Sequence, residues 1–368
     1  MIPTSFIDLH GRNTSATIAA GRCTSALPRG ASSLRALLFS RRFFAAAATF
    51  GAAAFVPSAS AEYAWSVNQT ITTPNSVTDQ SAKVDALSDV ALAVSLTVQS
   101  AGRLSFTHSE SRFYVGYDRS GNLLVQGGGG VSGVDSYLGY SSSGEGSATI
   151  TGANSTWSMS GLLRVGVSGT GSLAIESSGK VSVADKVILG TAPFSTGLVR
   201  LTSGGILETR YIRKSEGQVS LEINGGTICA LADTGAADVP SSFFSEFVTD
   251  DIELSGESLG EGQVAFTFDT NGKNVAINTG LSYVQGSGHN LAIGFAKIGT
   301  GTLNLSGQTT KAHGAGFSAD VIGNARIAEG TFALDTLPIY IGEGAFASNS
   351  IDVSGTAARL RVCSISFE

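Results

Sequence analysis

The carboxylates of this chain are densest at Asp250, Asp251 and Glu253, with Glu246 and Glu257 close by. A cluster of this kind can bind calcium, or it can line the sugar cleft of a polysaccharide lyase or glycosidase. Isolated acidic runs are more commonly solvated loops. We therefore expect a loop here, with no catalytic residue and no metal ligand, and we keep the sugar cleft as an alternative.

The histidines are scarce and stand far apart along the chain, at His10, His108, His289 and His313. A hydrolytic triad needs a base within hydrogen-bond reach of a nucleophile, and an acid that orients the base. His289 and His313 lie in turn-like segments, and no Gly-x-Ser-x-Gly pattern stands between a strand and a helix. We expect surface-loop positions for these histidines rather than a hydrolase site.

One short segment, Asp269-Thr270-Asn271-Gly272, carries oxygen ligands at a spacing like that of an EF-hand calcium loop. Such a loop requires a glutamate six residues after the glycine, and this chain has Asn278 there. A tight turn between two strands is the better interpretation. We expect neither a metal nor a cofactor in this protein.

Aromatic residues gather at Phe113, Tyr114, Tyr117, Tyr137 and Tyr140. Exposed in a row, their rings could stack on sugars. Their position beside a hydrophobic-glycine step equally suits partial burial against neighbouring strands. We favour this structural role for the aromatic residues.

These residues belong to a unit that recurs along the middle of the chain. A hydrophobic-glycine step recurs at Gly116, Gly139, Gly166 and Gly190. A second glycine opens the following strand at Gly121, Gly146, Gly171, Gly197 and Gly217, with spacings of 25, 25, 26 and 20 residues. Self-similarity at a period of about 20–50 residues is typical of a solenoid, in which each repeat buries its apolar face against its neighbours.

Each unit supplies about three short strands whose alternate residues point inward, with glycines where the backbone turns at positive φ. Stacking the units places equivalent residues above one another. One predicted inward ladder consists of Val115, Leu138, Val165 and Leu189, and a second consists of Leu123, Ala148, Leu173 and Val199. The fold predicted from this pattern is all-β, a right-handed parallel β-helix.

The first 61 residues differ from the rest. They carry six arginines against the single acid Asp8, then an apolar stretch over 43–56, and then Pro57-Ser58-Ala59-Ser60-Ala61. This order is typical of a secretory signal peptide with cleavage after Ala61. The pair Arg41-Arg42 resembles a twin-arginine signal, so both export routes stay open.

The whole chain has a net charge of −6, and removal of this leader, with its six arginines and one acid, leaves a distinctly more acidic chain. We therefore expect neither a nucleic-acid partner nor a polybasic membrane patch. Cys229 and Cys363 lie about five turns apart in such a solenoid, roughly 25 Å. A disulfide needs Cα atoms within about 7 Å, so we expect these two cysteines not to pair.

Two motifs carry a resemblance to a known family. The pattern Val115-Gly116-Tyr117, followed by segments such as Gly171-Ser172-Leu173-Ala174-Ile175, resembles the repeat of type V secretion passengers and of some sorting-signal surface proteins of Gram-negative bacteria. Downstream, the run over 297–307 resembles the autotransporter-associated β-strand repeat. Its matching positions are Lys297, Gly299, Gly301, Leu303, Leu305 and Gly307.

The resemblance divides the chain into five parts. These are a leader and signal peptide (1–61), an N-terminal β cap (62–110), β-helix repeats (111–235), a β-helix with the autotransporter-associated strand repeat (236–340) and a terminal rung (341–368). An autotransporter also has a membrane barrel, for which residues 341–368 leave no room. A truncated gene, a translocator in the outer membrane on another polypeptide, and a released product stay open as explanations.

The resemblance implies an exported protein of Gram-negative type, at the cell surface or outside the cell. We expect a non-catalytic passenger that works as an adhesin or structural spacer, with glycans or surface proteins as partners. The alternative is a secreted carbohydrate-active β-helix enzyme, with acidic and basic residues converging near 240–260.

Overall fold

The computed structural model describes residues 63–78, 81–86, 93–248, 251–255, 259, 263–284, 293–306, 317–318, 324–341, 351–353 and 357–367. These residues form β-strands, turns and loops without an α-helix, and they belong to one structural unit, Phe43–Glu368. Within them, no helix is long and apolar enough to cross a membrane. The leader, the Ala61 cleavage site and Arg41-Arg42 lie outside the described residues.

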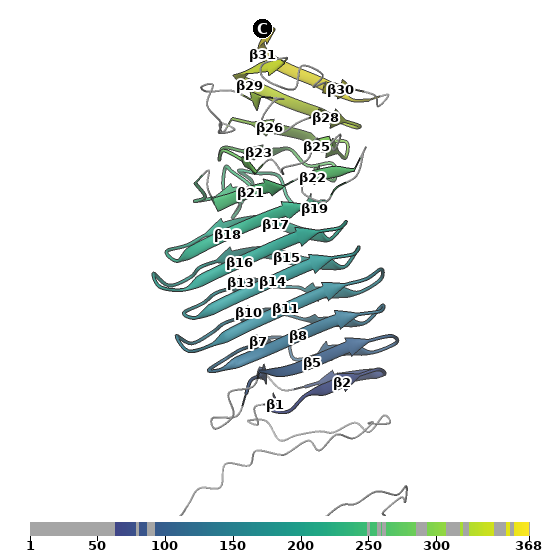
Figure 1. The fold of residues 1–368 in the computed structure, drawn as a ribbon, viewed down its shortest axis with the longest axis vertical. Coiled ribbons are helices and arrows are strands. Elements are labelled where there is room, and N and C mark those ends of the chain that lie inside the picture. Colours follow the sequence, from purple (N-terminus) through teal and green to yellow (C-terminus); the bar gives the residue numbers. More distant parts are fainter. Residues whose placement is uncertain are drawn as a thin grey trace, which may run out of the picture. The chain divides into compact units, whose positions relative to one another are not determined.

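The strands form a parallel β-solenoid with three walls, and successive turns rise one above another (Figure 1). Every pair of named strands in the described part is parallel, as expected when each turn repeats the path of the one before it. The predicted all-β, parallel fold class is confirmed.

The first wall is a nine-stranded sheet. Its strands are β2 (Gln69–Ile71), β5 (Val94–Gln99), β8 (Ser120–Gln126), β11 (Glu145–Thr151), β14 (Thr170–Glu176), β16 (Thr196–Thr202), β18 (Gln218–Asn224), β21 (Ile252–Ser255) and β24 (Ser282–Val284).

The second and third walls join in one sheet because β15 and β17 run through both. The second wall contains β3 (Pro74–Val77), β6 (Arg103–Phe106), β9 (Gly130–Gly133), β12 (Thr156–Met159), the first halves of β15 (Lys180–Leu189) and β17 (Ile206–Lys214), β19 (Gly226–Ala230), β22 (Val264–Asp269), β25 (Ile293–Ile298), β28 (Asn324–Ile327) and β30 (Ile351–Val353).

The third wall contains β1 (Tyr63–Trp65), β4 (Ser81–Val84), β7 (Arg112–Val115), β10 (Asp135–Leu138), β13 (Leu163–Val165), the second halves of β15 and β17, and β20 (Phe244–Ser245). A five-stranded sheet completes the later turns. It consists of β23 (Val275–Ile277), β26 (Thr302–Leu305), β27 (Phe317–Ser318), β29 (Thr331–Ile341) and β31 (Arg359–Phe367).

Both predicted inward ladders are present. Val115, Leu138, Val165 and Leu189 are register partners from strand to strand, and each is fully buried. Leu123, Ala148, Leu173 and Val199 form the second ladder and are at most 2% exposed. The core is therefore a set of columns, each built by one residue per turn.

The two predicted columns require glycine for different structural reasons. Gly116, Gly139, Gly166 and Gly190 have φ between 60° and 74°, as predicted. The glycines of the strand-opening column do not have a positive φ. At Gly146, for example, a Cβ would overlap the carbonyl of Val115 in the turn below. Close stacking of backbones excludes a side chain there.

Gly217 does not belong to the strand-opening column, which corrects the prediction. Gly197 pairs in register with Val219, so Val219 occupies that column in β18. Gly217 lies one turn above Ser195, and a Cβ on it would overlap the backbone of the Ala192–Ser195 turn. It is a glycine because a neighbouring turn packs on it, as at Gly169.

The segment predicted as an N-terminal cap is built as further turns of the same solenoid. Strands β4, β5 and β6 pair in parallel with β7, β8 and β9, one on each wall. The apolar alternation of this segment therefore continues the ladders instead of closing them. Cys229 is buried and free, in agreement with the expectation for this residue.

Candidate functional site

The predicted acidic region does not assemble into a cleft among the residues that are described. Asp250 and Glu257 lie outside them. Both carboxylate oxygens of Asp251 lie 2.8 Å from Lys214 Nζ, and Oδ2 also accepts the N–H of Val248. Lys214 stands next to Leu189 in register, at the end of an apolar ladder. Asp251 thus neutralises a half-buried cation at the end of this ladder.

This ion pair predicts a specific pattern of stability changes. Asp251→Ala leaves the Lys214 ammonium without its partner, so we expect the unfolding free energy to fall by about 1–3 kcal/mol. In a Lys214→Met background the same change should cost less than half as much. Urea unfolding of the four proteins of this double-mutant cycle measures the coupling. Equal losses in both backgrounds would show that the pair does not stabilise the fold.

The other sequence-predicted residues are placed as follows. His108 lies in a loop, where its Nδ1 accepts the N–H of Glu110 at 3.1 Å, while His289 and His313 are outside the described residues.

Asp269 Oδ1 accepts the N–H of Asn271 at 2.7 Å, which makes the predicted tight turn. In the described part of the chain, no group of three or more His, Cys, Asp or Glu side chains could hold a metal ion.

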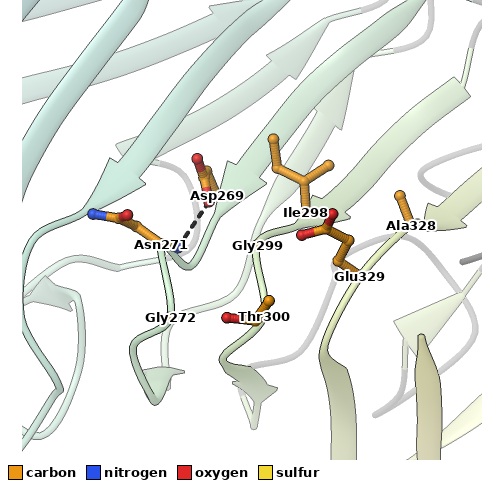
Figure 2. Close-up of a pocket in the computed structure, with 8 residues that line it drawn as sticks. All are labelled: Asp269, Asn271, Gly272, Ile298, Gly299, Thr300, Ala328 and Glu329. Carbon is orange, nitrogen blue, oxygen red and sulfur yellow. Dashed lines mark hydrogen bonds between the residues drawn. The ribbon is translucent and has the colours of Figure 1, made fainter. Parts of the chain in front are cut away.

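A hollow of about 590 Å³ opens at one corner of three successive turns (Figure 2). The corner segments that follow β22, β25 and β28 lie side by side there. They line the hollow with Asp269, Asn271, Gly272, Ile298, Gly299, Thr300, Ala328 and Glu329. The segment after β25 carries part of the strand-repeat motif. Of that motif, Leu303 and Leu305 are buried, and Gly307 lies outside the described residues.

Lys297 lies in the core beside this hollow. It follows Phe268 and precedes Ile327 in an inward ladder, and it is fully buried. Its Nζ donates to Thr270 Oγ1 at 3.0 Å, to the Glu329 carbonyl at 2.9 Å and to the Gly299 carbonyl. Burial lowers the pKa of Lys297 to about 8, although two nearby carboxylates favour the charged form. The ammonium therefore links three turns.

The four tyrosines form a compact cluster on the outer side of the third wall. Tyr114 stacks on Tyr137 with ring centroids 4.9 Å apart, and Tyr117 stacks on Tyr140 at 4.8 Å. Edge contacts join the two pairs, and Lys83 Nζ lies 3.3 Å from the centroid of the Tyr117 ring. The broad ring faces contact one another, which supports the structural interpretation over sugar stacking.

Basic side chains extend this cluster along the third wall. One register column runs Lys83, Tyr114, Tyr137, Arg164, Ile188 and Arg213. Beside it, the same strands place Arg112, Asp135, Lys186 and Tyr211 outward. We call these ten residues, together with Tyr117 and Tyr140, the tyrosine–cation face.

Charge on the first wall has the opposite sign. Its strands β11, β14, β18 and β21 place Glu145, Glu176, Glu222 and Glu253 outward, and β16 adds Arg200. The tyrosine–cation face has five basic residues, and its strands add the acids Asp135 and Asp185, the second of which lies 3.1 Å from Lys186 Nζ. Basic charge is therefore concentrated on one wall of an acidic chain.

A scan against protein-family models, a search of curated proteins and a search of solved structures each found no match. The resemblance to autotransporter passengers thus rests on the sequence motifs, and it stays a prediction.

Proposed function

We propose that this chain is an exported, non-catalytic, passenger-type β-solenoid that binds a ligand along its outer wall, as an adhesin or structural spacer. The observation that carries the proposal is the tyrosine–cation face. Its aromatic and basic side chains follow one wall over several turns, which suits distributed binding rather than a reaction at one point.

The signal-like leader and the two repeat motifs support the exported, passenger-like part of the proposal. The ladder architecture supports the spacer role, because every added turn buries the apolar residues of its neighbour. Folding turn by turn from one end would also help to draw such a chain out of the cell, as the family resemblance implies.

One observation favours the alternative, a carbohydrate-active enzyme. The corner hollow is lined by Asp269 and Glu329, which lie in the first and the third of its three turns, and two carboxylates flanking a glycosidic bond are what glycoside hydrolysis uses. Asp269, however, is held in its turn by the N–H of Asn271.

Incubation of the full chain with a panel of neutral and acidic polysaccharides separates the two proposals. We expect binding in a pull-down of insoluble or immobilised glycan, with no change in polymer length by size-exclusion chromatography. Shortening of any polymer, abolished in a Glu329→Gln variant, would overturn the non-catalytic proposal in favour of the enzyme.

A further inference from the structure

We infer that the tyrosine–cation face binds a linear anionic polysaccharide, carboxylated or sulfated, laid along the stack of turns. The inference rests on the proposed function and names its ligand class and its surface. Lys83, Arg112, Arg164, Lys186 and Arg213 face outward on this wall, whereas the charged residues on the strands of the first wall are four glutamates and Arg200. An anionic chain is attracted to the one wall and repelled by the other.

The length of the face fits a polymer better than a small ligand. Lys83 and Arg213 stand at the two ends of one register column, with Arg164 between them. Adjacent strands are about 4.8 Å apart, so five steps from β4 to β17 place these ends about 24 Å apart. The column crosses the strands at right angles, so a polymer in contact with all three cations runs parallel to the stack.

The chemistry of the face favours hydrogen-bond donation to anions. Burial raises the pKa of Tyr114 to about 12, and burial also raises the pKa of Tyr137. The Tyr137 hydroxyl donates to Asp135 Oδ2 at 3.5 Å and Tyr114 is only 6% exposed, so these two tyrosines form the base of the face and its outward cations meet the anion. Arginine guanidinium groups pair with carboxylate and sulfate-like oxygens through two parallel hydrogen bonds.

The ring contacts disfavour a single-stranded nucleic acid. Proteins bind such strands by stacking bases on open aromatic faces. Here Tyr117 lies between Lys83 and Tyr140, and Tyr114 lies against Tyr137. Stacking also holds the tyrosines in place before binding, which reduces the entropy cost of association.

The test measures binding of the full chain to dextran sulfate, polygalacturonate, neutral dextran and single-stranded DNA by surface plasmon resonance. We expect binding to the two anionic polysaccharides that weakens as salt is raised. Arg164→Gln/Arg213→Gln should weaken it at least tenfold. The control Lys180→Gln/Arg200→Gln removes the same charge from the second and first walls, so it should change binding less than twofold.

The outcomes are distinguishable. An equal loss in both double variants, or a lack of binding to both anionic polysaccharides, would overturn the inference. If neutral dextran alone bound, the proposed binding function would stand while this ligand class would be wrong. Tighter binding to DNA than to polygalacturonate would likewise reject the class, and cleavage of a polymer would reject the proposed function itself.

Discussion

Replacing Gly139 with alanine is expected to lower the unfolding free energy by about 2–5 kcal/mol. Gly139 has a φ of 66°, a conformation that costs an alanine about 1–2 kcal/mol. In addition, its new Cβ would overlap the carbonyl of Thr170 in the next turn. Overpacking of this kind adds about 1–3 kcal/mol, because the adjacent turn cannot withdraw without breaking its own parallel pairing.

Gly235→Ala is the matched control for this prediction. Gly235 has a φ of 77°, but nothing lies within 4 Å of the position of its Cβ. We expect a loss of about 1–2 kcal/mol there, from backbone strain alone. Hydrogen exchange of β10, β11 and β14, together with urea unfolding, measures both effects, since a solenoid can open locally. Equal losses in the two variants would mean that the turns are not stacked so closely.

The inward ladders could be predicted from the sequence because two regularities coincide in them. Alternation at period two separates inward from outward residues within a strand, and the hydrophobic-glycine step, which recurs after 23 and then 27 residues, places Leu138 between Val115 and Val165. Both rules are local, so they hold wherever the repeat is regular. The positive φ of Gly139 follows from the same regularity, since each turn bends at the same place.

Gly217 shows where local patterns fail. Gly217-Gln218-Val219 has the same glycine-x-hydrophobic pattern as the strand openings, but the turn before β18 brings Val219 into that column. A glycine that precedes a strand and one that opens it look alike in sequence. Only hydrogen-bond register between turns distinguishes them.

The tyrosine–cation face was found only in part for a related reason. The tyrosines stand beside repeated glycine steps and could be recognised, whereas Lys83, Arg164 and Arg213 join their column across connections of unequal length. The inward position of Lys297, by contrast, could have been predicted from the sequence. Lys297 stands two residues after the buried Phe295 in β25, so both side chains point to the same, inward side of the strand. A lysine is seldom expected in such a position.

Lys297→Ala is expected to lower the unfolding free energy of the later turns by about 3–5 kcal/mol. The change removes the donor to the buried Thr270 Oγ1 and to the partly buried carbonyls of Gly299 and Glu329, and a buried group left without a partner costs about 1–3 kcal/mol. It also opens a void in the ladder between Phe268 and Ile327. Lys297→Met fills that void, so it should cost less than the alanine variant while still losing the three bonds.

The charge of Lys297 also makes a prediction about pH. Burial lowers its pKa to about 8, below the value of 10.5 expected for an exposed lysine. Between these two values the unfolded chain binds more protons than the folded chain, so the unfolding free energy rises with pH. Below the lower value both states are charged, and the cost of burying the ammonium is constant.

Comparison with Lys297→Met isolates this effect from other titrating groups such as Tyr114. We expect the unfolding free energy of the native chain, minus that of the methionine variant, to increase from about pH 8 to about pH 10.5. Urea unfolding at several pH values, followed by hydrogen exchange in β22, β25 and β28, measures this difference. A difference that stays flat, or that falls with pH, would show that Lys297 reaches solvent. The three-turn link through its ammonium would then be wrong, because an amine that is free in solvent is not held by Thr270 Oγ1 and the carbonyls of Gly299 and Glu329.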